Sequence, residues 1–210
     1  RAAGSSPQIS PDDRKGEKML EFEKKLMLTV PEYRSLMKLR DDDAEIICQT
    51  NYYYDSDGAD MNALGITCRI REKNGRFEAS LKAHQGHGCS VEKTVSAAGR
   101  DDCTLFRGMN ISLQGSLKTV RTVLLRDDGV EVTADRNTYL GHVDYELEIE
   151  FDPSKEKRAE FILKLIGKYL CRGKNDAEKA EFFRRQTVCR SKSERFFEIK
   201  KQEQLKKRCS

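Results

Sequence analysis

The stretch Leu20-Glu21-Phe22-Glu23-Lys24-Lys25-Leu26 decides the predicted fold, because charged and apolar residues largely alternate along it. In a β-strand, residues two apart share a face at a spacing of ~6.6 Å, so the two glutamates and the second lysine project together. Adjacent carboxylates repel each other unless a cation lies between them, and an oxygen-preferring divalent cation is the simplest such partner. The stretch therefore predicts a strand that carries a metal site beside a lysine, an arrangement suited to a polyphosphate.

Seven later segments are rich in β-forming residues and also predict strands. Asn74-Gly75 and Asp127-Asp128-Gly129 are typical of tight hairpin turns and join two pairs of these segments. The predicted strands cover residues 46–55, 64–73, 77–82, 90–95, 117–126, 130–136 and 143–151.

Like charges are concentrated on single strands. The glutamates of Glu146-Leu147-Glu148-Ile149-Glu150 share one face of their strand, and the arginines of Arg69-Ile70-Arg71 share one face of theirs. A sheet with a core side and a water side explains any one strand, but such a sheet normally mixes its charges. We therefore predict an α+β fold: a closed antiparallel barrel of ~8 strands, a tunnel with a charged interior and apolar faces outward under C-terminal helices.

The apolar period changes from two to three or four after Asp152-Pro153, which predicts helices. A first helical stripe ends at Gly173, and Asn175-Asp176-Ala177-Glu178 caps a second helix. The tail from Lys192 predicts a strand or short loop that runs into a basic amphipathic helix.

Three polar segments lie between the predicted strands. Thr29-Val30-Pro31-Glu32 has the spacing of a capping box and predicts a short helix through Leu39. Asp41-Asp42-Asp43 predicts a solvated turn rather than a metal cluster. His84-Gln85-Gly86-His87-Gly88 predicts a mobile hairpin turn, because its glycines oppose a helix and hard cations prefer oxygen ligands to imidazole.

The composition, 37% hydrophobic and 35% charged over 210 residues, supports one domain over residues 19–210 after a flexible leader over residues 1–18. The net charge of +4 is too small to indicate a nucleic-acid partner. Seven cysteines without C-x-x-C spacing argue against a disulfide framework or a zinc site and are typical of a cytoplasmic protein. No apolar run approaches the ~18 residues of a membrane span, so we expect no membrane partner. We expect a monomer or a homodimer.

The ordered set of these motifs resembles the CYTH superfamily, the triphosphate tunnel metalloenzymes, which include class IV adenylate cyclases and thiamine triphosphatases. Glu21-x-Glu23-x-Lys25 looks like the signature of that superfamily, and the similarity runs from Leu20 to about Phe197. The later motifs, in order, are Gln49-Thr-Asn-Tyr-Tyr-Tyr-Asp55, Arg69-x-Arg71, Leu81-Lys82, Glu92, Arg121, Asp135 and Tyr145-Glu-Leu-Glu-Ile-Glu150. The resemblance implies a tunnel of eight strands that binds a triphosphate together with Mg²⁺ or Mn²⁺.

The resemblance also implies a role for individual residues. The implied metal-binding residues are Glu21, Glu23, Asp135, Glu146 and Glu148. The implied phosphate-binding residues are Lys25, Arg69, Arg71, Lys82, Arg121 and Lys192. The residues predicted to be catalytic are Glu23, Lys25 and Glu148. Lys118, Arg126 and Arg195 are alternatives to Arg121 and Lys192, because they lie close to them in the sequence.

Three functions are compatible with this pattern. The first is metal-dependent hydrolysis of a triphosphate, either inorganic triphosphate or an organic one such as a nucleotide or thiamine triphosphate, by in-line attack of water. The second is cyclisation of ATP to cyclic AMP, in which the ribose hydroxyl attacks instead. The third is a non-catalytic polyphosphate-binding module. We find no adenine-reading motif and no lost metal-binding acid, so the sequence favours hydrolysis.

Overall fold

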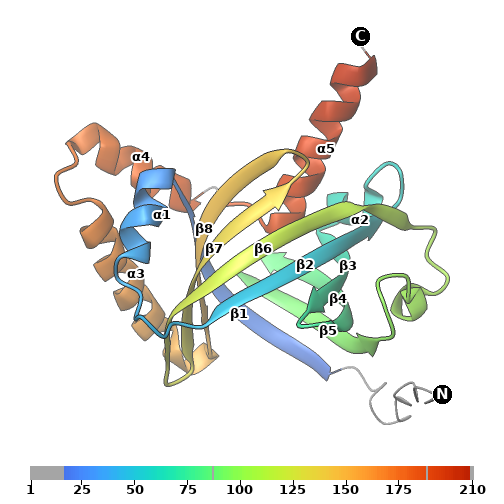
Figure 1. Ribbon diagram of the computed structural model, residues 1–210, viewed down its shortest axis with the longest axis horizontal. Helices are drawn as coiled ribbons and strands as arrows, with labels where there is room; N and C mark the ends of the chain where they lie inside the picture. Colours follow the sequence, from blue (N-terminus) through green and yellow to red (C-terminus); the bar gives the residue numbers. More distant parts are fainter. Residues whose placement is uncertain (1–16, 87, 188, 209–210) are drawn as a thin grey trace, which may run out of the picture.

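The computed structural model describes residues 17–86, 88–187 and 189–208 of the 210-residue chain. Within these residues, eight antiparallel strands form a closed barrel in the order β1-β5-β4-β3-β2-β6-β7-β8, which confirms the predicted α+β architecture (Figure 1). The strands are β1 (Glu17–Leu28), β2 (Ile46–Asp55), β3 (Ile66–Lys73), β4 (Arg76–Gly86), β5 (Cys89–Ala97), β6 (Ser112–Asp127), β7 (Val130–Tyr139) and β8 (His142–Phe151). Residues 1–16 of the predicted leader lie outside the described residues, and its last two residues belong to β1.

Strand β1 closes the barrel by pairing with two strands in turn. It pairs with β5 up to Phe22 and with β8 from Phe22 to Leu28, so it changes partner at this one residue. Just beyond that point, the backbone N–H of Glu23 donates to the carbonyl oxygen of Gly88 over 2.9 Å. Gly88 has a φ of +73°, and a Cβ atom there would clash with the carbonyl oxygen of Glu23, so the crossing requires glycine.

Both predicted hairpin turns are confirmed. Asn74 and Gly75 join β3 to β4 with φ angles of 53° and 72°, and Asp128 and Gly129 join β6 to β7 with φ angles of 46° and 74°. Positive φ at both central residues is the property that favours Asn-Gly and Asp-Gly in tight hairpins. The turns therefore set the register of four barrel strands.

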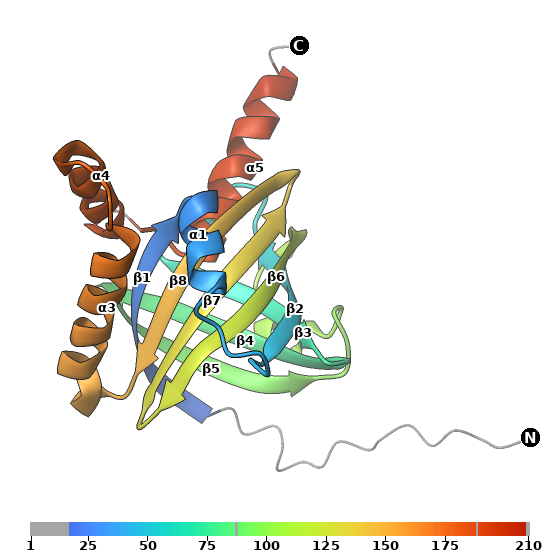
Figure 2. The ribbon, with the colours of Figure 1, turned by 60° about the vertical axis from the view of Figure 1, so that its left-hand side comes forward.

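The main apolar core lies outside the barrel, under three helices that cover β1, β7 and β8 (Figure 2). Leu26, Leu147 and Ile149 point away from the tunnel and are fully buried in this core. The helices are α1 (Val30–Met37), α3 (Glu156–Leu170) and α4 (Asp176–Thr187). The predicted helices are thus present, although the helix predicted to run through Leu39, α1, ends at Met37. Shorter elements are α2 (Asp60–Ala63), η2 (Cys103–Phe106) and η3 (Pro153–Lys155).

The tail is helical from its first predicted residue, so the expectation of a strand or short loop there was wrong. Helix α5 (Lys192–Arg208) begins at Lys192, and the Ser191 hydroxyl accepts a hydrogen bond from the backbone N–H of Glu194. Phe196 is fully buried against Tyr53, and the remaining residues of this cluster are Leu117, Tyr139 and Phe197. These apolar contacts anchor the first part of α5 to the barrel, whereas its far end projects from the molecule (Figure 1).

Two strand boundaries differ from the prediction by four residues or more. Strand β4 continues to Gly86, so His84 belongs to a strand rather than to a hairpin turn. His87, the second histidine of that predicted turn, lies outside the described residues. Strand β6 begins at Ser112, and its early part contains Gly115 with a φ of 143°, where a Cβ atom would lie 2.8 Å from the Phe196 ring. The start of the strand escaped prediction because it pairs with the end of β2 and packs against α5, and both are remote in the sequence.

The predicted capping box of α1 forms and becomes part of a larger ion network. Glu32 accepts a hydrogen bond from the Thr29 backbone N–H over 2.8 Å, and Thr29 Oγ1 accepts one from the Glu32 backbone N–H over 3.4 Å. The same buried carboxylate contacts Lys174 and, over 2.7 Å, Arg185. Burial opposes ionisation of Glu32, but the hydrogen bonds from Lys174 and Thr29 outweigh it and lower its pKa below 4.5. This carboxylate therefore ties α1 to α4.

Replacing Glu32 with glutamine should lower the free energy of unfolding by about 2 kcal/mol, because it removes charge-assisted hydrogen bonds at a buried position. Since the folded-state pKa is lowered, the stabilisation is present above the unfolded pKa and disappears as the pH falls through the folded pKa. Urea unfolding at pH 7 and at pH 3 measures both effects. An equal difference between Glu32→Gln and the wild type at the two pH values would contradict this role.

Candidate functional site

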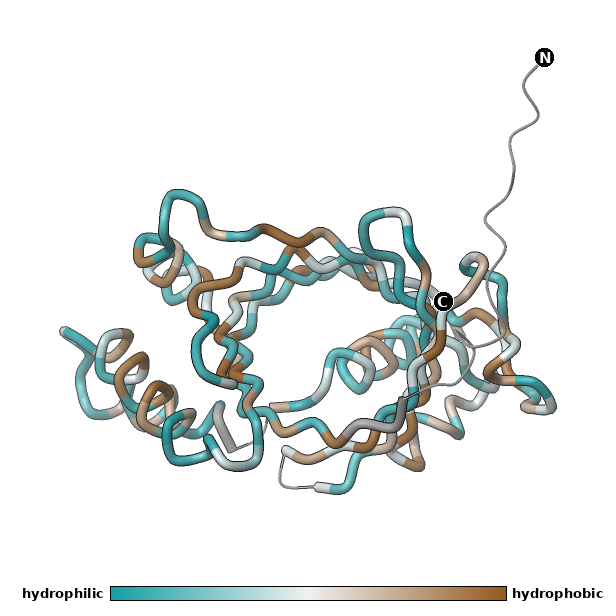
Figure 3. Tube along the Cα trace, turned by 90° about the horizontal axis from the view of Figure 1, so that it is seen from below, coloured by the Kyte–Doolittle hydropathy of each residue, from teal (hydrophilic) through white to brown (hydrophobic). Residues whose placement is uncertain are grey.

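The strand register brings acids and bases together inside the barrel. Cross-strand neighbours on the inner face include Lys25 with Glu148, Arg121 with Asp135, and Lys82 with Glu92. Because inward residues alternate along every strand, these acids and bases project into the same interior. The acidic strands β1 and β8 also lie side by side, with Glu23 opposite Glu150. Figure 3 looks along the barrel, whose strands form a ring. The inner side chains leave a cavity of about 130 Å³.

Most of the residues that the sequence assigned to the site line this cavity. They are Glu21, Glu23, Lys25, Arg69, Arg71, Lys82, Arg121, Glu148 and Lys192. Asp135 and Glu146 are fully buried behind the cavity wall and contact Lys192. Of the three alternative cations, Lys118 and Arg126 are exposed. Arg195 instead contacts Oε2 of Glu146, whereas Lys192 contacts Oε1 of the same carboxylate.

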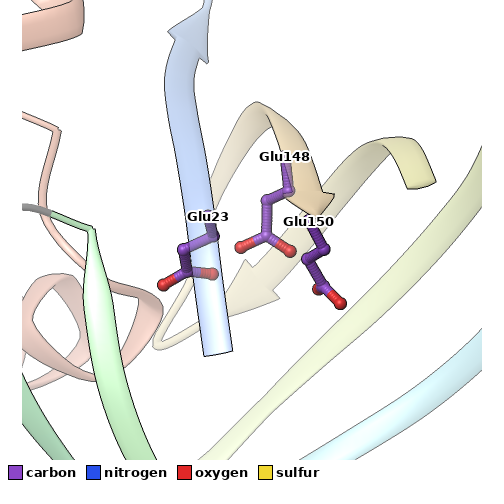
Figure 4. Close-up of side chains that lie close together, drawn as sticks. All are labelled: Glu23, Glu148 and Glu150. Atoms are coloured by element: carbon purple, nitrogen blue, oxygen red, sulfur yellow. The ribbon is translucent and has the colours of Figure 1, made fainter. Parts of the chain in front are cut away.

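Two groups of three acids have carboxylate oxygens within 4.8 Å of one another. Glu23, Glu148 and Glu150 form the group that lines the cavity, with Glu23 on β1 facing the two residues of β8 (Figure 4). Asp135, Glu146 and Glu148 form the buried group. Glu148 belongs to both groups and so connects them.

Basic residues keep the shared acid ionised. Glu148 Oε1 lies 3.0 Å from Lys25 Nζ and 2.9 Å from Lys192 Nζ, and Glu148 Oε2 contacts Arg121. Burial alone would raise the pKa of Glu148, but Lys192, Lys25 and Arg121 together hold it well below its usual value. Glu150 differs, because burial and the neighbouring charge of Glu148 raise its pKa. The cavity therefore holds one firmly ionised carboxylate beside one that protonates more easily.

The cationic wall of the cavity contains one unbalanced charge. Arg69 is paired with Glu92 at 2.8 Å, and Lys82 is paired with Glu21 at 2.5 Å. Arg71 instead donates to the amide oxygen of Asn51 over 3.0 Å, and among the described residues no carboxylate forms a salt bridge with it. Burial and the nearby Arg69 lower the pKa of the Arg71 guanidinium to about 10. A buried cation without a counter-ion indicates a place for an anion.

Several lining residues were missed by the sequence assignment. They are Gln49, Tyr53, Thr67, His84, Glu150, Ser191 and Ser193. Glu150 was recognised as sharing a strand face with Glu148, and its position two residues further on could have identified it as a site residue. Ser191 lies just before α5 and Ser193 lies in its first turn, and no barrel-strand period could have predicted them.

The donor set fits a hard divalent cation. Both acidic groups offer only carboxylate oxygens, which Mg²⁺ and Mn²⁺ prefer, and each group places three of them close together. In the described residues, no group of cysteines and histidines accompanies them. The cavity thus combines oxygen ligands for a metal with guanidinium and ammonium groups for an anion.

Comparison with known proteins agrees with this geometry. The family model for the CYTH domain matches residues 19–180. A Bacillus subtilis protein named as a candidate triphosphatase, YjbK, is 27% identical over 158 residues, which cover 68% of this chain and 83% of that protein.

Two solved structures share the fold. A candidate adenylate cyclase from Bacillus halodurans has a TM-score of 0.64 at 21% identity and covers 86% of this chain and 98% of its own. HpAC1 from Hippeastrum, a candidate adenylyl cyclase described as having a dominant triphosphatase activity, has a TM-score of 0.54 at 22% identity and covers 70% and 88%. In this protein, no helix within the described residues is both long enough and apolar enough to cross a membrane.

Proposed function

This chain belongs to the CYTH domain family, and on that premise we propose that it hydrolyses a triphosphate inside the barrel with the help of Mg²⁺ or Mn²⁺. The substrate class is inorganic triphosphate or an organic triphosphate such as a nucleotide or thiamine triphosphate. The names of YjbK and HpAC1, both associated with triphosphatase activity, support the proposal.

The observation that carries this proposal is that the Arg71 guanidinium, which forms no salt bridge with any described carboxylate, lines the same cavity as an acidic group. A polyanion supplies the missing counter-charge for Arg71, and a divalent cation supplies it for the carboxylates. A triphosphate with its metal supplies both counter-charges at once. Neither a simple anion nor a metal alone would do so.

We assign the metal to four residues of the two acidic groups, Glu23 and Glu148 at the cavity and Asp135 and Glu146 behind it, and leave Glu150 free to act on water. Glu21 lines the cavity but is paired with Lys82, so its place in the metal shell stays a prediction. A bound metal would neutralise charge on the phosphate oxygens and offset the charge that develops during transfer.

The protein's own residues would bind and orient the phosphates. Arg71, Arg69 and Lys82 hold the oxygens of the phosphates that are not transferred, through charge-assisted hydrogen bonds. Lys25 is kept protonated because Glu148 and Glu23 raise its pKa despite burial, so it remains a cation beside the reacting phosphate. Water attacks the terminal phosphorus in line with the leaving oxygen. Glu150 is suited to take the proton of that water, because its raised pKa makes it a stronger base than Glu148, whose pKa is lowered.

A phosphate-release panel tests the proposal. The purified protein is incubated with inorganic triphosphate, ATP, GTP or thiamine triphosphate and with Mg²⁺ or Mn²⁺, and cyclic AMP is assayed in parallel. We expect metal-dependent phosphate release from at least one of these substrates. Cyclic AMP without phosphate release would identify a cyclase instead. Tight triphosphate binding without any product would identify a polyphosphate-binding module.

A further inference from the structure

Lys192, the first residue of α5, lies at the centre of the buried acidic group. Its Nζ atom is 2.9 Å from Asp135 Oδ2 and 2.9 Å from Glu148 Oε1, and it also contacts Glu146 Oε1. An ammonium group has three N–H donors, so one lysine can serve three carboxylates. The exposed fraction of these four side chains is at most 11%, so the ammonium group is held almost entirely by carboxylates.

The remaining oxygens of this group are held by other residues. Arg121 binds both oxygens of Asp135, over 2.9 and 2.8 Å, and also contacts Glu148 Oε2. Arg195 Nη2 donates to Glu146 Oε2 over 2.8 Å. Arginine stays protonated, and its planar guanidinium group can form two parallel hydrogen bonds to a carboxylate. The arginine contacts are therefore more strongly fixed than those of the Lys192 ammonium group. Lys192 contacts one oxygen of each acid, and it shares the Asp135 oxygen with Arg121 and the Glu148 oxygen with Lys25.

We propose that a divalent cation and the Lys192 ammonium group compete for Asp135, Glu146 and Glu148, so that a cation bound there displaces Lys192 and shifts the first turn of α5. A divalent cation and the ammonium group cannot occupy the same position between these three carboxylates, and a cation added beside the ammonium group would be repelled strongly at contact distance in a buried site. The inference rests on the proposed function only for the identity of the cation. It assigns to Lys192 the role of an internal competitor of the metal.

The shift would be small, because other residues in and just after the first turn are anchored. Ser193 Oγ lies 2.7 Å from Thr67 Oγ1, Arg195 Nε donates to Asp144 Oδ2 over 2.9 Å, and Phe196 is fully buried. Lys192 itself already lines the cavity. A displaced ammonium group thus remains at the cavity wall, where it can bind phosphate oxygens. Metal and triphosphate would then each raise the affinity for the other.

Mn²⁺ titration of Lys192→Met by calorimetry, without any triphosphate, tests this competition. We expect Mn²⁺ to bind about tenfold more tightly or better than to the wild type, because the variant has no internal competitor. Arg190→Met is the matched control, since Arg190 is exposed beside α5 and pairs with Glu198. It should bind Mn²⁺ like the wild type. Unchanged or weaker Mn²⁺ binding by a folded Lys192→Met protein would overturn the proposal.

A second measurement uses the wild-type protein alone and so decides the question even where Lys192→Met does not fold. Hydrogen exchange of the backbone amides at the start of α5 should become faster when Mg²⁺ saturates the protein. Unchanged exchange there at saturation would also overturn the proposal. Neither measurement contains a triphosphate, so their outcome is independent of whether the protein hydrolyses one.

Discussion

Replacing Glu148 with glutamine is expected to lower the rate of metal-dependent triphosphate hydrolysis by about 10³-fold or more. Glu148 is the acid that both groups share, so the neutral amide weakens cation binding in each. The charge stabilisation that a catalytic metal supplies is several kcal/mol, and about 4 kcal/mol corresponds to ~10³-fold in rate. Steady-state kcat over a series of Mg²⁺ concentrations measures the loss.

Folding has to be followed in the same variant, because Glu148 also balances three buried cations. Its removal leaves Lys25, Lys192 and Arg121 with fewer counter-ions, which destabilises the barrel. Thermal unfolding followed by circular dichroism shows whether Glu148→Gln is folded at the assay temperature. Glu45→Gln is the control, since Glu45 is exposed and pairs with Arg126 outside the cavity. A folded Glu148→Gln protein with a kcat within tenfold of the wild type would refute the site.

Replacing Arg71 with methionine should reduce kcat/KM for the triphosphate about 100-fold while leaving stability nearly unchanged. A bidentate, charge-assisted contact with a phosphate is worth about 3 kcal/mol, which corresponds to ~100-fold. In the folded protein the substitution removes a buried cation without a counter-ion, which favours folding. It also leaves the Asn51 amide without its hydrogen-bond donor at a fully buried position, which opposes folding by about 1–3 kcal/mol.

The combination of lost activity and retained stability distinguishes a binding residue from a structural one. Initial rates over a range of inorganic triphosphate concentrations, together with urea unfolding, give both quantities for Arg71→Met. Arg136→Met is the matched control, because Arg136 is exposed on β7 outside the cavity. Should Arg71→Met keep the wild-type kcat/KM, the guanidinium would have no part in substrate binding.

The barrel could be predicted because its evidence lies in short stretches of sequence. The alternation in β1 and β8 places Glu23 and Glu148 on the inner face of their strands. The Asn-Gly and Asp-Asp-Gly turns fix the register of the strands that they join. The charges concentrated on each strand then require groups of opposite sign nearby, which the interior of a closed barrel brings together. Local patterning and global closure agree in this chain.

The contribution of α5 could not be predicted in the same way. The helix reaches the cavity through Lys192 and Ser193, together with Ser191 just before it. It is held there by Phe196, which packs against Tyr53, more than a hundred residues earlier. Such contacts are tertiary and leave no periodic trace in the tail, whose adjacent phenylalanines suit a strand as well as a helix. The distinction between the paired Arg69 and the unpaired Arg71 is likewise tertiary, because it depends on which side chain reaches Glu92.

The central claim is that one cavity binds a triphosphate and a divalent cation together and hydrolyses the triphosphate. Its most direct test is phosphate release from inorganic triphosphate, and from the organic triphosphates of the panel, by the wild-type protein after treatment with EDTA and again after addition of Mg²⁺ or Mn²⁺. We expect release to stop with EDTA and to return with the metal. Release that continues undiminished in EDTA, or no release from any of these substrates with either metal, would contradict the account.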